Sequence, residues 1–250
     1  RLLPSIKIIK ESLLIEQKNT EAKTLDFKKC IEIKNLNFSY GKEFQNIFTN
    51  QNLKIFRNKI HVIVGNSGGG KSTLTDIIAG LNKVNNLALK IDEKEIFQLS
   101  GKIVIDNLSY CDQVGFIFPG TLEQNITMFD NKPNLEKLKE SIQIVNINGL
   151  DNINLKTDLF DGGKTLSGGQ KQRLNLARII YQNPDIVILD EATSNLDEKN
   201  EKNILDNIVN WSKNNMKTLI LISHNDYHLQ YADCVIDINQ NKISSKNVNF

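Results

Sequence analysis

One glycine-rich segment constrains the fold of this 250-residue chain more than any other feature. The stretch Lys59–Gly65 has the composition of a buried strand, and Lys71–Ala79 has the pattern of a helix that ends at Gly80. Between them, Gly65–Thr73 reads GNSGGGKST and fits the pattern G-x-x-x-x-G-K-[ST]. Backbone N–H groups of such a loop converge on phosphate oxygens, and the following helix N-terminus also favours an anion. The sequence therefore predicts a phosphate-binding loop between a strand and a helix.

Each residue type in this loop has a chemical reason to be there. Glycines let the backbone approach phosphate oxygens closely. Lys71 supplies a compact cation for the β- and γ-phosphates of a nucleotide, and the Ser72 hydroxyl is a ligand for Mg²⁺. The loop alone leaves open whether the protein is a kinase, a GTPase or an ATPase. The expected nucleotide-binding residues of the loop are Gly65, Asn66, Ser67, Gly68, Gly69, Gly70, Lys71, Ser72 and Thr73.

A second segment, Asp185–Glu191, places two carboxylates after an apolar run. Such a run predicts a core strand that delivers Asp190 to the carboxyl edge of a sheet, where doubly wound folds bind ligands. Asp190 could hold Mg²⁺ there, directly or through water. Glu191, one residue further on, is expected to contact a water molecule and not the metal ion. The alternative is an ordinary strand followed by a polar turn, and the phosphate-binding loop upstream favours the metal site.

A third segment, Leu166–Arg173, reads LSGGQKQR and precedes the predicted helix Lys171–Tyr181. A serine and two glycines at a helix N-terminus form a second anion-binding end in the same chain. A plain helix cap would explain Ser167 by itself. On this segment alone the plain cap is the favoured interpretation, and the combination with the other two segments reverses that preference in favour of an anion-binding end.

Apolar runs and helical periods alternate along much of the chain, which predicts an α/β fold. The net charge of the chain is only +2, so its composition gives no support to nucleic acid as a partner bound by a broadly basic protein. Three scattered cysteines favour neither a disulfide framework nor a zinc site, and they fit a reducing cytosol. The predicted strands are Ile31–Phe38, Leu53–Phe56, Asp185–Leu189 and Thr218–Ser223, and the further helices are Pro133–Val145 and Asp197–Trp211.

Together these three segments, in this order, resemble the nucleotide-binding domain of ATP-binding cassette (ABC) transporters. Leu166–Gln170 matches that family's signature sequence letter for letter, and the likeness extends over roughly Ile31 to Ser245. It implies a P-loop NTPase with a RecA-like parallel-sheet core, an antiparallel β subdomain and an inserted α-helical signature subdomain at about residues 115–180. It also implies that residues 29–250 form this domain.

The same resemblance implies roles for further residues. Tyr40 matches the aromatic residue that stacks on adenine, Gln113 the glutamine that reaches Mg²⁺ and the attacking water, and His224 the histidine near the γ-phosphate. Ser194–Asp197 matches the D-loop, whereas His61 and His228 match nothing. The expected catalytic residues are Glu191, His224, Gln113 and Lys71; the expected metal ligands are Ser72, Gln113 and Asp190; and the remaining ATP contacts are Tyr40, Gln113, Ser167, Gly168, Gly169 and Gln170.

Within the family, three segments look like those of exporters. They are the stretch Phe116–Ile126, the stretch Thr157–Gly163 with Asp161 where glutamate is usual, and the opening Arg1–Ser5 with the amphipathic residues after it. Residues 1–28 are therefore expected to be the end of a last transmembrane helix plus a linker. The stretch Asp161–Gly163 and the opening Arg1–Ser5 lean toward lipid-linked oligosaccharide flippases, whereas multidrug, lipid A and peptide exporters stay open as alternatives.

The resemblance also implies cofactors and partners. We expect ATP and Mg²⁺, a head-to-tail homodimer of this domain, an N-terminal transmembrane domain in the same polypeptide and no nucleic acid. The expected location is the cytoplasmic face of the plasma (inner) membrane. The alternatives are a separate ATPase subunit of an importer, a soluble ABC ATPase, or a non-hydrolysing regulatory domain.

Overall fold

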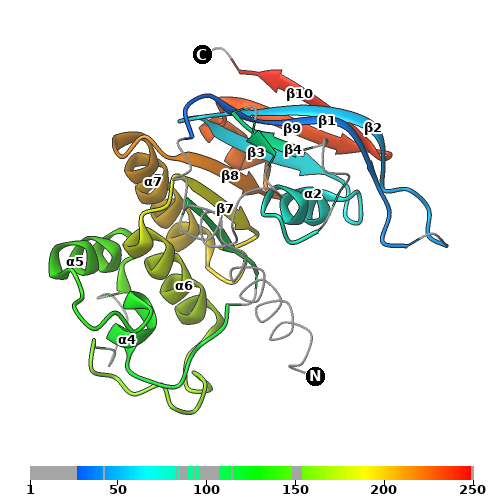
Figure 1. The fold of residues 1–250 in the computed structure, drawn as a ribbon. Helices are drawn as coiled ribbons and strands as arrows, with labels where there is room; N and C mark the ends of the chain where they lie inside the picture. Colours follow the sequence, from blue (N-terminus) through cyan, green and yellow to red (C-terminus); the bar gives the residue numbers. More distant parts are fainter. Residues whose placement is uncertain are drawn as a thin grey trace, which may run out of the picture. The chain divides into compact units, whose positions relative to one another are not determined.

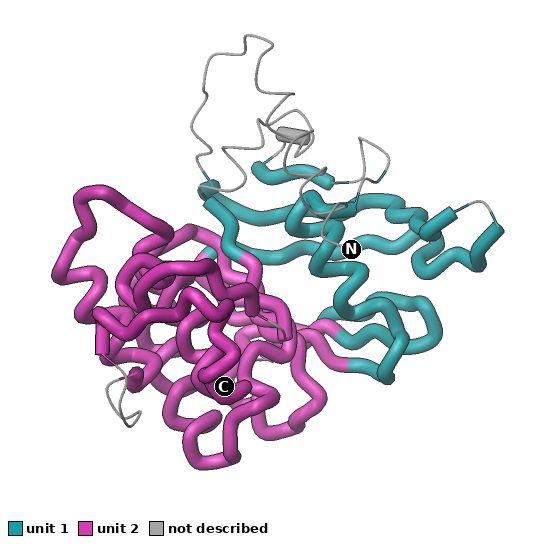
Figure 2. Tube along the Cα trace, turned by 90° about the horizontal axis from the view of Figure 1, so that it is seen from below, with its two compact units in different colours: residues 1–57, 65–109, 237–245 teal, residues 58–64, 110–236, 246–250 magenta. Residues whose placement is uncertain are grey.

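The computed structural model describes residues 27–41, 43–82, 84, 89–92, 94–95, 107–113, 115–147 and 154–248 (Figure 1). Most of the expected membrane-helix end and linker, residues 1–26, lies outside the described residues. The chain divides into two compact units (Figure 2). Unit 1 comprises residues 1–57, 65–109 and 237–245, and unit 2 comprises residues 58–64, 110–236 and 246–250.

Unit 1 contains an antiparallel sheet with the strand order β2-β1-β4-β5. Strand β1 pairs with β2 in a register that places Ile31 opposite Ile55, and it pairs with β4 on its other side. Ile31, Ile33, Leu36 and Phe38 of β1 are buried, and a register shift between Ile33 and Leu36 interrupts the alternation expected for a strand with one face on a core. Helix α2 (Lys71–Ile78) follows the glycine loop, as predicted. The strands are β1 (Cys30–Phe38), β2 (Phe48–Phe56), β4 (Leu89–Ile91) and β5 (Lys94–Glu95).

Parallel strands form the core of unit 2. Strand β8 (Thr218–Ile222) pairs in parallel with β3 (Ile60–Gly65) and with β7 (Ile186–Asp190). All five residues of β7 and of β8 are buried, which is typical of a parallel strand covered on both faces. The sheet has the order β10-β9-β3-β8-β7-β6, completed by β6 (Leu108–Cys111), β9 (Cys234–Asn239) and β10 (Lys242–Asn247).

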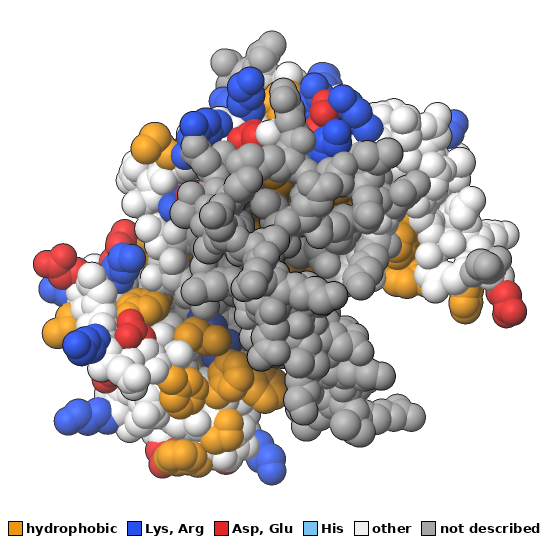
Figure 3. Space-filling model, in the orientation of Figure 1, with side chains coloured by type: hydrophobic (Ala, Val, Ile, Leu, Met, Phe, Trp, Pro, Cys, Tyr) orange, Lys and Arg blue, Asp and Glu red, His pale blue; other side chains and the backbone are white. Residues whose placement is uncertain are grey.

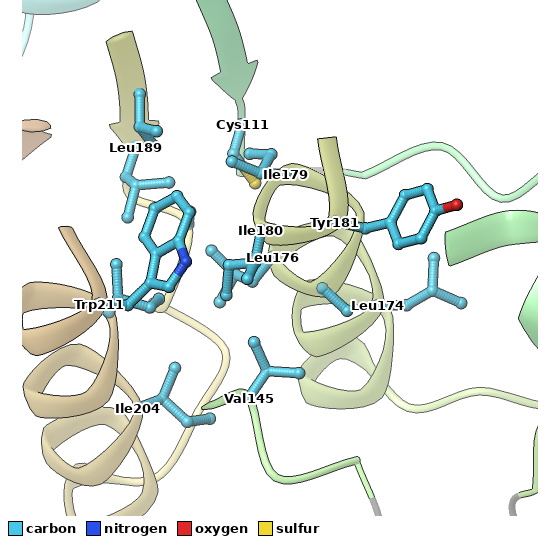
Figure 4. Close-up of a cluster of buried hydrophobic side chains, with 14 of the residues drawn as sticks. Cys111, Val145, Leu174, Leu176, Ile179, Ile180, Tyr181, Leu189, Ile204 and Trp211 are labelled. Atoms are coloured by element: carbon cyan, nitrogen blue, oxygen red, sulfur yellow. The ribbon is translucent and has the colours of Figure 1, made fainter. Parts of the chain in front are cut away.

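Helices of unit 2 share one apolar core with its strands. Figure 4 shows Trp211 of α7 pointing toward Leu176 and Ile180 of α6, below Leu189 of β7. Each of these side chains is at most 5% exposed, so truncating Trp211 would cost about 3–5 kcal/mol. The helices are α4 (Leu122–Thr127), α5 (Leu135–Ile144), α6 (Gly168–Gln182), α7 (Glu198–Asn214) and the 3₁₀ helix η3 (Asp226–Tyr231).

The predicted α/β class is confirmed, and three predicted boundaries differ from the structure by three residues or more. Helix α6 begins at Gly168, three residues before the predicted Lys171. Helix α7 continues to Asn214, and β2 begins at Phe48 instead of Leu53. All three cysteines, Cys30, Cys111 and Cys234, are free thiols. Within the described ranges, no helix is both long enough and apolar enough to span a membrane.

Candidate nucleotide-binding and hydrolysis site

The glycine loop of unit 1 has backbone angles that require glycine. Gly65, Gly68 and Gly70 have φ angles of 139°, 75° and 99°. A Cβ atom on Gly65 would lie 2.1 Å from the carbonyl oxygen of Ile238, so no side chain fits there. Gly70 is the N-cap of α2 and lacks a side-chain cap bond. The loop is therefore a closely packed backbone cradle leading into a helix N-terminus, which fits the phosphate groups of a nucleotide.

Lys71 points its cation into this cradle. Its Nζ donates hydrogen bonds to the carbonyl oxygens of Gly65 and Asn66, at 3.0 Å each, and the side chain is 6% exposed. The charge is thus held within the loop, where bound phosphate would need a counter-charge. Ser72, the next residue, is exposed, so its hydroxyl is accessible to a metal ion.

Tyr40 contacts the same loop through its hydroxyl group, which lies 3.1 Å from Oγ1 of Thr73. The ring meets Phe38 edge-on with centroids 5.2 Å apart. The Tyr40 side chain is nevertheless 58% exposed. An exposed aromatic ring tethered beside a phosphate loop is what stacking on a purine would require.

In unit 2, two expected catalytic residues contact each other. His224 Nε2 donates a hydrogen bond to Glu191 Oε1 over 2.7 Å. Glu191 directly follows β7 and has a φ of 50°, a left-handed conformation that is strained for a residue with a side chain. Both side chains are partly exposed and line a cavity of about 530 Å³. A base and its partner at an open cavity can polarise a water molecule.

Asp190 and Gln113 lie near Glu191 in unit 2. Asp190 is 9% exposed and accepts a hydrogen bond of 2.9 Å from the Tyr110 hydroxyl, a contact that the sequence did not indicate. Gln113 Nε2 donates to Ser194 Oγ over 3.4 Å, so the glutamine meets the expected D-loop.

The expected metal ligands are divided between the two units: Ser72 belongs to unit 1, and Gln113 and Asp190 belong to unit 2. No group of three or more histidine, cysteine or acidic side chains able to hold a metal occurs among the described residues. One carboxylate, one hydroxyl and one amide suit Mg²⁺, which keeps several waters and takes phosphate oxygens as ligands. The residue types therefore fit this ion.

The signature segment begins helix α6. Ser167 is the N-cap: its hydroxyl accepts from the Gln170 N–H at 3.2 Å, and the Gln170 side chain accepts from the Ser167 N–H at 2.7 Å. The plain-cap interpretation of Ser167 thus describes this structure, and the early cap explains why α6 starts at Gly168. Residues 167–170 also line a cavity of about 420 Å³ together with the D-loop residues Asn195, Leu196 and Asp197.

A patch of exposed apolar side chains lies on unit 2, visible as orange atoms over α4 and neighbouring loops in Figure 3. Phe116 is 56% exposed and packs against Phe118, and Arg178 of α6 lies 5.2 Å from the Phe118 ring centroid. Arg178 also donates hydrogen bonds to the carbonyl oxygens of Phe116 and Asn125, and burial lowers the pKa of its guanidinium group to about 10.

Asp161, in the segment that resembles an exporter loop, accepts hydrogen bonds from the N–H groups of residues 163 and 165. These bonds shape the turn before the signature segment.

Comparison with known proteins identifies the family. The sequence model of the ABC transporter family matches residues 48–194. An uncharacterized ABC transporter ATP-binding protein of Haemophilus influenzae is 36% identical over 85% of this chain and 38% of its own length. The microcin-J25 export ATP-binding/permease protein McjD of Escherichia coli is 33% identical over 85% of this chain and 37% of its own length.

The same fold occurs in the structure of a bacterial Atm1-family ABC exporter with ATP bound. The two superpose with a TM-score of 0.81 at 23% identity, over 97% of this chain and 44% of the exporter chain. This chain spans about two fifths of the length of the curated relatives it matches. The fold is the expected P-loop NTPase with parallel-sheet core, antiparallel β subdomain and helical subdomain. The chain belongs to the ABC transporter family.

Proposed function

We propose that this chain hydrolyses ATP to power an ABC exporter or flippase, and that it does so in a dimer of two such domains. The observation that carries the proposal is the Glu191–His224 contact at the end of β7, in a chain whose glycine loop is also complete. Both elements are needed for hydrolysis, which argues against a non-hydrolysing regulatory domain. Relatives named as export ATP-binding/permease proteins favour an exporter over an importer subunit or a soluble ATPase.

In this proposal, the loop residues and Lys71 bind the phosphates, and Tyr40 stacks on adenine. Glu191 accepts a proton from the attacking water, and His224 orients the water and the γ-phosphate. Phosphoryl transfer needs mainly positioning and charge neutralisation, so these residues supply most of the catalysis. Bound Mg²⁺, held by Ser72, Gln113 and Asp190, would neutralise phosphate charge.

The second half of the site comes from another copy of the domain in this proposal. Ser167 to Gln170 of that copy would contact the γ-phosphate, using the helix N-terminus of α6 as an anion-binding end. The cavity formed by residues 167–170 and the D-loop supports this role. A chain that carries both the phosphate loop and the signature segment can form a head-to-tail homodimer with two complete sites.

We further propose that residues 29–250 form this domain, that residues 1–28 connect it to a transmembrane domain in the same polypeptide, and that it lies on the cytoplasmic face of the plasma (inner) membrane. The names of the relatives, which join an ATP-binding part and a permease, support this arrangement. The exposed patch around Phe116 offers an apolar surface for the membrane domain. No nucleic-acid partner is proposed.

The test is phosphate release by the full-length protein in lipid vesicles, with ATP binding measured in parallel. Glu191→Gln should retain ATP binding and lose at least about 10²-fold in turnover, the scale of a lost general base. A Glu191→Gln variant that releases phosphate at the parent rate would contradict the proposed hydrolysis mechanism.

A further inference from the structure

A second carboxylate–histidine pair lies beside the first. Glu201 of α7 and His228 of η3 are 3.4 Å apart between Oε1 and Nε2. Their side chains are 17% and 7% exposed, whereas Glu191 and His224 are 29% and 48% exposed. Both pairs line the same cavity of about 530 Å³. We call Glu191 and His224 the outer pair, because both are partly exposed, and Glu201 and His228 the inner pair, because both are largely buried.

The inner carboxylate binds the turn that carries Glu191. Thr193 Oγ1 donates a hydrogen bond of 2.8 Å to Glu201 Oε1, and Thr193 is 5% exposed. The Ser194 N–H closes the same turn by donating to the Glu191 carbonyl oxygen at 3.1 Å. Because Glu191 has a left-handed φ, contacts of the surrounding residues must hold this conformation in place. The Thr193–Glu201 bond is one such contact.

The segment that carries His224 is fastened to the same helix. η3 begins at Asp226, two residues after His224, and its Tyr231 hydroxyl donates to Asp206 of α7 over 2.6 Å. Lys202 of α7 lies 5.3 Å from the ring centroid of Tyr227. His228, on the same short helix, contacts the Glu201 oxygen that also accepts from Thr193. Glu201 therefore touches both segments that carry the hydrolytic pair.

We propose that Glu201 is a positioning residue for ATP hydrolysis, which holds the Glu191 turn at its distance from His224. Glu201 does not touch the reacting atoms; it acts through Thr193 on Glu191. This inference rests on the proposed role of Glu191. Displacement of a reacting group by about 1 Å can cost up to about 10²-fold in rate, so loss of this anchor should lower turnover more than ATP affinity.

The test compares substitutions at Glu201 in the full-length protein in lipid vesicles. Glu201→Ala should lower kcat at least about tenfold and change KM for ATP less than about twofold. Glu201→Gln keeps an oxygen that can accept a hydrogen bond from the Thr193 hydroxyl, so this variant should retain most of the parent kcat. Equal kcat in Glu201→Ala and the parent, or equal loss in the Ala and Gln variants, would overturn the proposal.

Two controls separate positioning from general stability. Tyr231→Phe removes the hydrogen bond to Asp206 but keeps the Thr193–Glu201 bond that acts on Glu191, so kcat should fall less than in Glu201→Ala. Thr193→Val breaks the same bond from the other side, and it provides the test if Glu201→Ala does not fold. Thr193→Val should reproduce the loss in kcat, and full activity in that variant would overturn the proposal.

A final comparison uses the Glu191→Gln background. If Glu201 acts through Glu191, adding Glu201→Ala to Glu191→Gln should cause no further loss of turnover. If Glu201 acts independently, the losses of turnover from the two substitutions should multiply. A multiplied loss would overturn the proposal for Glu201. Full turnover by the Glu191→Gln variant would contradict the proposed function. Full turnover by the Glu201→Ala variant, with turnover lost in Glu191→Gln, would contradict only the positioning role of Glu201.

Discussion

His224 Nε2 and Glu191 Oε1 are 2.7 Å apart although 33 positions separate these residues in the sequence. The register of the parallel sheet explains the contact. Asp190, the last residue of β7, lies opposite Ile222, the last residue of β8. Glu191 and His224 follow these two strand ends, so the sheet brings both to one edge. Ligands in open α/β sheets bind at this kind of edge.

This contact predicts that the two residues act as a unit. Glu191→Gln and His224→Ala should each lower turnover at least about 10²-fold, because both residues act on the attacking water in the proposed mechanism. The double variant should be far less impaired than the product of the two losses. Steady-state phosphate release by all four proteins measures this coupling. Fully multiplicative losses would show that the residues act independently.

Lys71 should be essential for hydrolysis. Lys71→Ala removes a buried cation held within the phosphate loop, so turnover should fall at least about 10²-fold. Lys59→Ala is the matched control, because Lys59 is 54% exposed and pairs with Asp233 at 3.5 Å. The control should hydrolyse ATP at the parent rate. Phosphate release within tenfold of the parent by Lys71→Ala would refute the assignment.

Tyr40 should hold adenine through its ring. Tyr40→Ala should weaken ATP binding about tenfold, equivalent to about 1.4 kcal/mol of lost aromatic contact. Tyr40→Phe keeps the ring and loses only the bond to Thr73, so its affinity should stay within about threefold of the parent. Titration of the chain with a fluorescent ATP analogue gives both values. If Tyr40→Ala binds ATP as tightly as the parent, adenine is held elsewhere.

Two glycines of the phosphate loop should differ in their tolerance of a methyl group. Gly65→Ala should destabilise the chain by about 2 kcal/mol or more, because its Cβ would collide with the Ile238 carbonyl oxygen. Gly68→Ala has nothing within 4 Å of the added Cβ and bears only the strain of its φ of 75°, about 1 kcal/mol. Urea unfolding of both variants measures the difference. Equal stability would contradict the described loop geometry.

The sequence predicted the elements whose signals are local. Apolar β7 and β8 and the helix after the glycine loop all appear where expected. The sequence predicts a later start for α6 because glycines are poor helix formers, whereas the Ser167–Gln170 capping box begins the helix before them. The start of β2 was missed because its first half is polar, and pairing with β1 decides its conformation.

The site was predictable residue by residue but not as a set of contacts. Motif positions indicated Glu191 and His224 separately, and only the register of β7 and β8 joins them. The Tyr110–Asp190 bond links residues 80 positions apart, and no local pattern indicates it. The Thr193–Glu201 bond spans eight positions. It depends on how α7 packs against the turn after β7, which the sequence does not reveal.

An ATP site completed by a second copy of the domain requires two domains to pair when nucleotide binds. Light scattering of the Glu191→Gln variant during size-exclusion chromatography, with and without Mg-ATP, tests it most directly. A shift from 28.4 kDa to twice that mass is expected only when nucleotide is present. A species of 28.4 kDa under both conditions, with ATP bound, would contradict the shared site.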